Sequence, residues 1–485
     1  MPPSKVPNSV AKLILELADQ QRNPAEIAQI LNLKKVQVST LLAYHKLRDS
    51  KTQVVDAEPV APEISEEPIS EAPEMENESP VEAHVSGVDP KNDAEEMDIE
   101  EDEADDGAGS GVYVGDDSDY GDAVYWNPQD AGAVPNPHLM IMGESGSGKT
   151  YAVQCLVAEL AQRAVPSILF DYGQSFELQH LEPAFKKFTG IREHLIGEEG
   201  LPINPLQIFP KDTQGPKSVA TRVSDVFDVA YHLGDIQRKV VIDAIRSAFE
   251  KAGISESKSS TWTKDLPTLL NLQNVLEEMS SNKEYSNQKN AVGVAARLMT
   301  FFMLTSFRSD TEMWSWDTLL KDTKHTVHVL QFRGLEGKTQ RVLVELLLWH
   351  LFFYLKSHGQ SALRLYCVLD EAHHLSFREG GPVGALLREA RKFGLGVIFA
   401  SQQPEDFSSV AFSNSASKLI FQTSDPTLKV SKSLSAKCSN YSSPEEIKQV
   451  ISVLPQGRAF FISKNRGHVV TLADFKKRAT LWHQK

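Results

Sequence analysis

Residues 143–150 have the sequence GESGSGKT, which matches the pattern G-x-x-x-x-G-K-[ST] at every fixed position. The glycines of such a loop let its backbone wrap around phosphates with the N–H groups pointing inward. Lys149 would reach the β- and γ-phosphates, and the Thr150 hydroxyl would ligate Mg²⁺. The apolar run Leu139–Met142 precedes the loop and a helical pattern follows it, as the motif requires. The sequence therefore predicts a site for ATP and Mg²⁺, with the nucleotide-binding residues Gly143, Glu144, Ser145, Gly146, Ser147, Gly148, Lys149, Thr150 and Tyr151.

A second apolar run, Leu365–Leu369, ends in two acidic residues, Asp370 and Glu371. Asp370 at the tip of a strand can hold Mg²⁺ through water, and Glu371 can orient and deprotonate an attacking water. A second carboxylate directly after the Mg²⁺ ligand favours hydrolysis over simple binding. The alternative is a surface strand that ends in charged residues, and the phosphate-loop sequence weighs against it.

A third apolar run, Leu395–Ala400, leads into the polar residues Ser401 and Gln402. We expect Gln402 to sense the γ-phosphate or to position water, although a turn that is polar because it is exposed would look the same. Arg391 precedes this run near the end of a helical pattern. It could reach into a neighbouring subunit's nucleotide and neutralise transition-state charge. The alternative is a solvated basic helix end, which the helix dipole favours.

Strand-like runs alternate with helical patterns from about residue 124 to residue 485. This alternation predicts an α/β fold with a mainly parallel sheet. Residues 215–309 show helical patterns without a clear strand, so we expect a helical insertion there. The predicted strands are His138–Met142, Ser167–Tyr172, Thr326–Phe332, Leu365–Asp370, Gly396–Ser401, Lys418–Gln422 and Gly457–Ser463.

The chain has 485 residues, 41% of them hydrophobic, and a formal charge of −15 that is unevenly distributed. Residues 51–122 contain 25 acidic and 2 basic residues, several prolines and no sustained apolar periodicity. Such a segment buries too little surface to offset its ordering entropy. We therefore predict an acidic disordered linker over residues 51–123. A DNA-mimicking or partner-binding acidic arm is the alternative.

Residues 1–50 contain three short helical patterns, and the stretch PAEIAQILNLKKVQVSTLLAYHKL resembles the helix-turn-helix families. Polar and basic side chains on the second helix of such a unit could meet phosphates and base edges. A small three-helix protein-docking module would show the same apolar pattern, so both interpretations stay open. The residues expected near the recognition helix are Lys34, Lys35, Gln37, Ser39, Thr40, Tyr44 and His45.

Three cysteines in no paired pattern argue against a disulfide scaffold or a four-ligand zinc site and fit a reducing cytosol. The N-terminus has no apolar signal stretch. The most apolar run, Val342–Leu355, has 14 residues, whereas a membrane span needs about 20. We therefore expect a cytoplasmic protein without membrane insertion, in which this run forms a buried helix.

Five segments occur in an order that resembles the HerA/FtsK superfamily of ring-forming DNA translocases and conjugation-type ATPases: PNPHLMIMGESGSGKT, ILFDYGQSF, INPLQI, VLDEAHHL and EARKFGLGVIFASQQP. The resemblance covers about residues 124–485. It implies a RecA-like motor fold, a hexameric ring and ATP-driven movement along double-stranded DNA through a central channel. It also implies that Asp370 and Glu371 are the Mg²⁺ ligand and the catalytic acid, that Gln402 is the polar sensor and that Arg391 acts in trans. Asp171 matches a further acidic position of less certain role.

The N-terminal region departs from this family, because HerA proteins usually carry a small β-barrel before the motor. A possible partner nuclease docks on the barrel side in HerA-like systems, and here a helix-turn-helix pattern and an acidic segment take that place. The sequence DEAH at residues 370–373 also occurs in another helicase superfamily, but 221 residues separate Lys149 from Asp370, too many for that family's first domain. We expect His373 and His374 to be structural, and Arg458 to be either a nucleotide contact or a turn residue.

Three functions remain open at this stage. The first is an ATP-hydrolysing DNA translocase that acts in defence, repair or mobile-element transfer. The second is an ATP-gated DNA-binding recruiter or switch with little turnover, against which Glu371 argues because a switch needs no water-activating acid. The third is a soluble conjugation- or secretion-type ATPase.

Overall fold

The computed structural model describes residues 26–27, 111–130, 134–304, 315–378, 380–402, 407, 409–425, 428–441 and 443–483. The chain divides into two compact units, residues 1–100 and 101–485. In the first unit only Glu26 and Ile27 are described, and both are helical. The predicted helix-turn-helix and the acidic segment up to residue 110 therefore lie outside the described residues and stay predictions.

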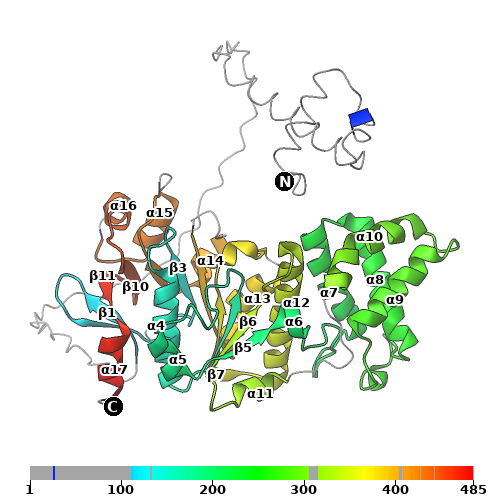
Figure 1. Cartoon of the computed structure of the whole chain (residues 1–485), viewed down its shortest axis with the longest axis horizontal. Helices are drawn as coiled ribbons and strands as arrows, with labels where there is room; N and C mark the ends of the chain where they lie inside the picture. The colour runs from blue at the N-terminus through cyan, green and yellow to red at the C-terminus, as the bar shows by residue number, and fades with distance from the viewer. Residues whose placement is uncertain are drawn as a thin grey trace, which may run out of the picture. The chain divides into compact units, whose positions relative to one another are not determined.

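An eleven-stranded sheet organises the second unit, in the order β2-β1-β11-β10-β9-β3-β8-β7-β4-β6-β5 (Figure 1). The strands from β9 to β5 pair in parallel, whereas β10, β11, β1 and β2 pair antiparallel at the other end. The predicted α/β fold with a mainly parallel sheet is confirmed. The strands are β1 Val112–Asp117, β2 Ala123–Trp126, β3 Leu139–Met142, β4 Ser167–Asp171, β5 Arg192–Leu195, β6 Val327–Gln331, β7 Ser361–Leu369, β8 Phe393–Ser401, β9 Ser417–Ile420, β10 Arg458–Ser463 and β11 Arg466–Leu472.

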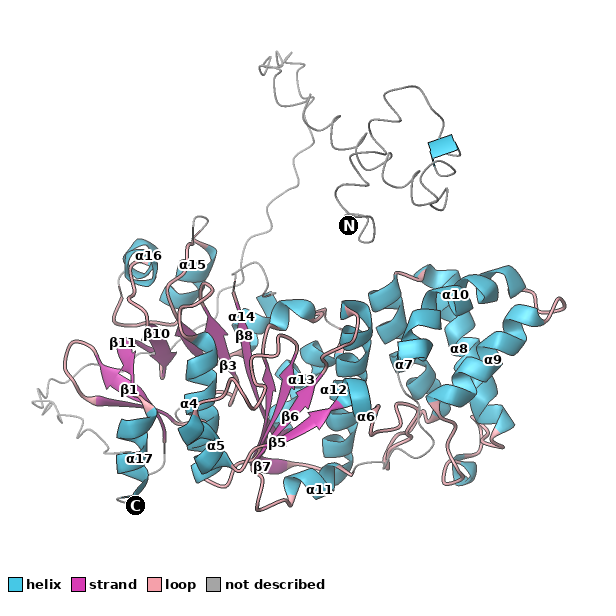
Figure 2. Cartoon of the chain, in the orientation of Figure 1, coloured by secondary structure: helices cyan, strands magenta, loops and turns pink. Residues whose placement is uncertain are grey.

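Helices cover both faces of the parallel strands (Figure 2), because successive side chains of a strand point to opposite faces. Leu139 and Ile141 of β3 belong to the buried layer that includes α4, and Met140 and Met142 to the layer that includes α12. The α-helices of the motor are α4 Lys149–Gln162, α5 Pro183–Thr189, α6 Ile196–Glu199, α11 Trp316–Leu320, α12 Gly337–His358, α13 Pro382–Glu389, α14 Ser409–Asn414, α15 Lys429–Ser435, α16 Pro444–Ser452 and α17 Phe475–His483.

Four α-helices form a separate lobe between β5 and β6, drawn in green in Figure 1. Their apolar faces pack on one another; the ring of Phe227, for example, meets the ring of Phe301 edge to face with 5.1 Å between centroids. This lobe lies in the segment predicted to be a helical insertion, and residues 215–304 contain no strand. Its helices are α7 Pro216–Tyr231, α8 Gly234–Lys251, α9 Leu269–Ser281 and α10 Gln288–Leu304.

The apolar run Val342–Leu355 lies within α12, as a buried helix of the motor. Glu345 in its middle is completely buried, and one of its oxygens accepts a hydrogen bond from Arg341 at 3.2 Å. Within the described part of the chain, we find no helix with the length and apolar character needed to cross a membrane.

The predicted end of the acidic linker at residue 123 is wrong, because the motor's sheet already begins at Val112. β1 pairs with both β2 and β11, and Val112 and Val114 are buried. The acidic residues that made this stretch look like linker have partners in the fold. Asp116 accepts a hydrogen bond from the Tyr113 hydroxyl at 2.6 Å, and Asp117 lies 2.9 Å from a ring nitrogen of His468.

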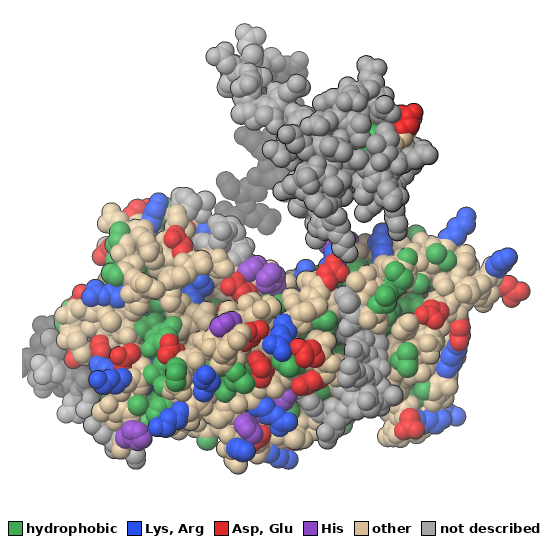
Figure 3. Space-filling model, in the orientation of Figure 1, with side chains coloured by type: hydrophobic (Ala, Val, Ile, Leu, Met, Phe, Trp, Pro, Cys, Tyr) green, Lys and Arg blue, Asp and Glu red, His purple; other side chains and the backbone are tan. Residues whose placement is uncertain are grey.

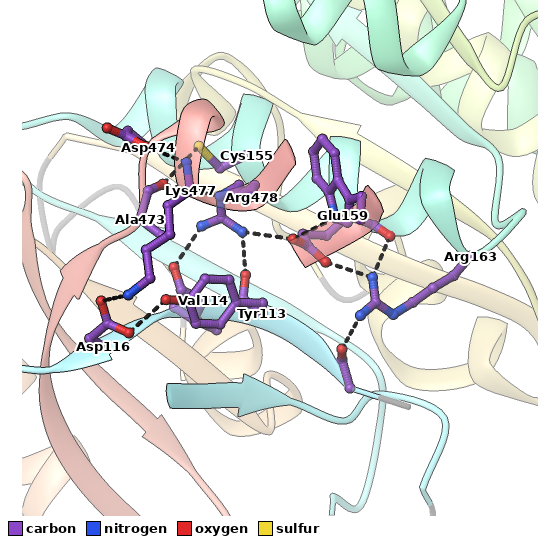
Figure 4. Close-up of polar contacts among 12 residues, drawn as sticks. Tyr113, Val114, Asp116, Cys155, Glu159, Arg163, Ala473, Asp474, Lys477 and Arg478 are labelled. Atoms are coloured by element: carbon purple, nitrogen blue, oxygen red, sulfur yellow. Dashed lines mark hydrogen bonds and ion pairs between the residues drawn. The ribbon is translucent and has the colours of Figure 1, made fainter. Parts of the chain in front are cut away.

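The C-terminal helix α17 fixes this first hairpin through one completely buried arginine, Arg478 (Figure 4). Its guanidinium donates hydrogen bonds to the backbone carbonyls of Tyr113, Val114 and Ala473. It also donates to a carboxylate oxygen of Glu159 at 3.2 Å. Buried charge of this kind is tolerated only when it is paired and fully hydrogen-bonded.

Glu159 gathers cationic and polar donors at the middle of α4, the helix that follows the phosphate loop. Besides Arg478 it accepts a hydrogen bond from Arg163 at 2.6 Å and one from the indole N–H of Trp482 at 3.0 Å. Figure 4 shows Arg478 and Arg163 approaching this carboxylate from different elements. The helix that begins at the nucleotide site is thus tied to both the first and the last elements of the motor.

Replacing Arg478 with methionine should lower the free energy of unfolding of the motor by about 3 kcal/mol, because a buried carboxylate and three carbonyls lose their donor. The shift of the urea unfolding midpoint measures this. Lys477→Met is the control: Lys477 is half exposed and pairs with Asp116, so its loss should cost less than about 1 kcal/mol. Equal shifts for the two variants would contradict the role assigned to Arg478.

Candidate nucleotide site

The phosphate loop connects β3 to α4 and requires glycine at two positions for different reasons. Gly148, the residue before α4, has φ +112°, a conformation that disfavours any residue with a Cβ. A Cβ on Gly143 would lie 2.5 Å from the Cβ of Phe421. The next residue, Glu144, donates its N–H to the carbonyl of Gln422 at 2.8 Å. The loop is therefore held against the segment that follows β9.

Lys149 begins α4, is buried, and donates from its ammonium to the carbonyl of Glu144 at 2.9 Å. Burial lowers its pKa, and the carboxylates of Glu371 and Asp370 act in the opposite direction. The buried hydroxyl of Ser147 has no hydrogen-bond partner among the described residues. These groups fit a phosphate, which would give the ammonium a countercharge and the hydroxyl an acceptor.

The other predicted nucleotide-binding residues divide into exposed and packed positions. Glu144, Ser145 and Gly146 are exposed at the tip of the loop, and Thr150 is half-buried in the first turn of α4. The ring of Tyr151 instead packs edge to face on Phe475 of α17, with 5.8 Å between centroids. The side chain of Tyr151 is therefore engaged with α17, and its backbone N–H is the group that lies at the N-terminus of α4, where a nucleotide would bind.

Asp370 follows β7 and is buried, with one carboxylate oxygen that has no partner among the described residues. Burial, together with the neighbouring carboxylates of Glu371 and Asp171, raises the pKa of Asp370 to about 7, although Lys149 acts in the opposite direction. Carboxylate and hydroxyl oxygens are the ligands that Mg²⁺ prefers. Asp370 and Thr150 therefore fit a Mg²⁺ site, in which the cation would give the unpartnered oxygen of Asp370 a ligand.

Glu371 and Gln402 meet across the ends of β7 and β8. The amide nitrogen of Gln402 lies 3.2 Å and 3.3 Å from the two carboxylate oxygens of Glu371. Glu371 has φ +49° and ψ +48°, the left-handed conformation that is uncommon for a residue with a side chain. The residues predicted as catalytic acid and polar sensor are thus brought into direct contact.

Asp171 at the end of β4 uses its carboxylate to hold the chain that follows. Its oxygens accept hydrogen bonds from the backbone N–H groups of Ser175 and Phe176 at 3.1 Å and 2.9 Å, and from the side-chain amide of Gln331 at 2.8 Å. These contacts assign Asp171 a positioning role for the loop after β4, next to Asp370.

Arg391 lies at the opposite edge of the sheet from the phosphate loop. It belongs to the short helix η3, Ala390–Lys392, which immediately precedes β8. β8 has nine residues and runs parallel to β3, so its two ends are more than about 25 Å apart. The exposed guanidinium donates to the carbonyl of Pro135. Arg391 therefore does not join the other predicted site residues within one chain.

Two residues that the sequence did not single out as functional also contact the site. A ring nitrogen of His373, expected from the sequence to be structural, lies 3.1 Å from a carboxylate oxygen of Glu371, the predicted catalytic acid. Gln456 donates from its side-chain amide to the carbonyl of Gly146 at 3.2 Å. The turn Pro455–Gly457 before β10 was the available signal for Gln456, but the sequence did not show which loop it would touch.

Comparisons with known proteins agree with this geometry. Residues 130–351 match the family model described as helicase HerA, central domain. The chain is 22% identical over 353 residues to the DNA double-strand break repair helicase HerA of Sulfurisphaera tokodaii, covering 70% of this chain and 64% of that protein. It is 23% identical over 337 residues to the HerA helicase of Saccharolobus solfataricus, covering 67% and 62%. The chain thus spans less than two thirds of the length of these relatives.

Among solved structures, VirB4 of Thermoanaerobacter pseudethanolicus shares the fold with a TM-score of 0.59 at 18% identity. The match covers 76% of this chain and 97% of VirB4. The matched family and the shared fold agree with the RecA-like motor that the sequence predicted. Residues 130–351, which contain the phosphate loop, therefore resemble the central domain of HerA helicases, and the chain shares its fold with VirB4.

Proposed function

We propose that the chain is an ATP-hydrolysing motor that acts on double-stranded DNA as a ring of several copies. One observation carries this proposal: the carboxyl edge of β3, β7 and β8 brings together a phosphate loop, a buried Asp370 and a Glu371 held by Gln402. One oxygen of Asp370 has no hydrogen-bond partner among the described residues. Phosphate, a divalent cation and an attacking water each have a complementary group at this edge. The proposed cofactors are ATP and Mg²⁺.

In the proposed reaction, backbone N–H groups of the loop and the ammonium of Lys149 hold the β- and γ-phosphates. Thr150 and Asp370 would hold Mg²⁺, which neutralises charge on the phosphate oxygens. Glu371 accepts a proton from the attacking water. The oxygen of that water then bonds to the γ-phosphorus as the bond between the γ-phosphorus and the ADP oxygen breaks. Gln402 lies beside Glu371 and can turn its amide towards the γ-phosphate.

The place of Arg391 supports an assembly of several chains. Since it lies at the far edge of its own sheet, its guanidinium can reach a nucleotide only when that nucleotide belongs to another copy. An arginine supplied in trans stabilises transition-state charge in other phosphoryl-transfer enzymes, by about 10³–10⁵ in rate. The proposed ring therefore completes each site with Arg391 from a neighbour.

Double-stranded DNA is the proposed substrate because both curated relatives are named as DNA repair helicases. Lys and Arg side chains on the face shown in Figure 3 are interspersed with acidic ones. A grip on DNA phosphates would then come from several subunits together rather than from one basic face. The N-terminal helix-turn-helix would recruit DNA or a partner protein, on sequence grounds alone.

Glu371→Gln should leave ATP binding within about twofold of the parent and lower turnover by at least about 10², because the amide cannot accept the proton from water. Binding of a fluorescent ATP analogue and release of phosphate measure the two effects. Lys149→Ala is the contrasting variant and should weaken binding itself. Turnover retained in Glu371→Gln would remove Glu371 from the mechanism.

Arg391→Ala alone should lower turnover by about 10³, if the arginine completes a neighbour's site. Mixing it with Glu371→Gln should restore part of the activity, because an Arg391→Ala subunit keeps its glutamate and can receive an arginine from a Glu371→Gln neighbour. Phosphate release by mixtures of the two inactive variants measures this. Mixed oligomers that stay inactive would contradict the action in trans.

Long duplex DNA should raise the turnover of the full-length chain, and the native mass should correspond to about six copies. Added salt should weaken the stimulation steeply, because contacts with DNA phosphates release counterions. Phosphate release with and without DNA, together with native mass determination, measures these properties. A monomer that binds ATP without turnover, with or without DNA, would favour the ATP-gated switch instead.

A further inference from the structure

Two side chains contact the carboxylate of Glu371, and they come from two neighbouring strand ends. Gln402 follows β8 and approaches both oxygens. His373, in the short helix η2 (Ala372–His374), places its Nδ1 atom 3.1 Å from Oε2 of Glu371. The same Nδ1 lies 3.4 Å from the hydroxyl of Ser401 at the end of β8. The proposed general base therefore sits between an amide and an imidazole.

The carboxylate of Glu371 determines which ring nitrogen of His373 carries a proton. An ionised carboxylate can only accept hydrogen bonds, so the ring nitrogen that faces Glu371 must carry a proton. In the neutral ring this leaves Nε2 without a proton. His373 can therefore orient Glu371 through the N–H of that ring nitrogen.

The two donors are not equivalent once a nucleotide is bound. Gln402 has one side-chain amide nitrogen, and that nitrogen faces Glu371. If the amide turns to the γ-phosphate, as the proposed function requires, Glu371 loses both contacts at 3.2 Å and 3.3 Å. His373 then remains as the donor that keeps the carboxylate of Glu371 in place. The left-handed backbone of Glu371 leaves this orientation dependent on side-chain contacts.

We propose that His373 is a positioning residue that holds Glu371 towards the attacking water through its Nδ1–H, while Gln402 is engaged with the γ-phosphate. This inference rests on the proposed ATP hydrolysis and on Glu371 as its general base. His373 itself touches neither the nucleotide nor the water. Its contribution should therefore appear in the rate of the chemical step and leave nucleotide affinity unchanged.

The test compares two substitutions at His373 in the full-length chain, one without and one with a hydrogen-bond donor. His373→Phe keeps a flat ring and loses the donor, so kcat should fall about tenfold, the value of one hydrogen bond to a charged group, with KM within about twofold. His373→Asn places an amide nitrogen near the position of Nδ1, and kcat should stay within about threefold of the parent. Steady-state phosphate release with varied ATP gives both parameters, and binding of a fluorescent ATP analogue gives the affinity.

A histidine outside the site provides the control. His180 also lies beside a glutamate, with its Nδ1 atom 3.8 Å from Oε2 of Glu177, so His180→Asn should leave kcat and KM unchanged. A His373→Phe variant with parental kcat would overturn the inference, as would equal losses in the Phe and Asn variants or a loss confined to KM. Glu371→Gln distinguishes failure of the proposed mechanism from failure of the role of His373. If Glu371→Gln hydrolyses ATP, the proposed mechanism itself fails. If Glu371→Gln is inactive and His373→Phe is fully active, only the role of His373 is overturned.

Discussion

The parallel pairing of β3, β8 and β7 is the constraint on which the site depends. Met142 at the end of β3 lies opposite Ser401, and Leu369 at the end of β7 lies opposite Phe399. The residues that follow these strands must therefore emerge at one edge of the sheet, although Lys149 after β3 precedes Asp370 after β7 by 221 positions in the sequence. This register brings Lys149, Asp370, Glu371 and Gln402 together, and it leaves Arg391 at the other edge.

The same register creates an electrostatic imbalance. Asp370, Glu371 and Asp171 converge on one buried region, where Lys149 is the cation that lowers the pKa of Asp370. Carboxylates held this close disfavour one another's ionised form, and burial adds to the penalty. A divalent cation would reduce both the repulsion between the carboxylates and the cost of burying their charge, so both would favour its binding to the site. The unpartnered oxygen of Asp370 and hydroxyl of Ser147 mark where ligand atoms fit.

Local sequence patterns were sufficient to predict the seven central strands and the phosphate loop, because buried parallel strands are continuous apolar runs. They failed at β1, whose Asp116 and Asp117 pair with Lys477 and His468 from the distant C-terminus, and at β11, the strand that contains His468. They also failed at β5, where polar Arg192–Leu195 forms the edge of the sheet. The contact of His373 with Glu371 could not be predicted for a related reason: the turn after β7 that aims the histidine depends on a left-handed Glu371, and the sequence shows no glycine there.

The two arginines near the site differ in which nucleotide they can serve. β10 runs antiparallel to β9, with Phe460 opposite Ile420, so Arg458 at its start lies at the edge of the phosphate loop of its own chain. Arg391 lies at the far edge, where its guanidinium donates to the backbone carbonyl of Pro135. Under the proposed function, an isolated chain would bind nucleotide with most of its polar groups already placed. Contact between chains would then supply the guanidinium of Arg391. Hydrolysis would then be coupled to assembly by geometry, without any change in the fold of the subunit.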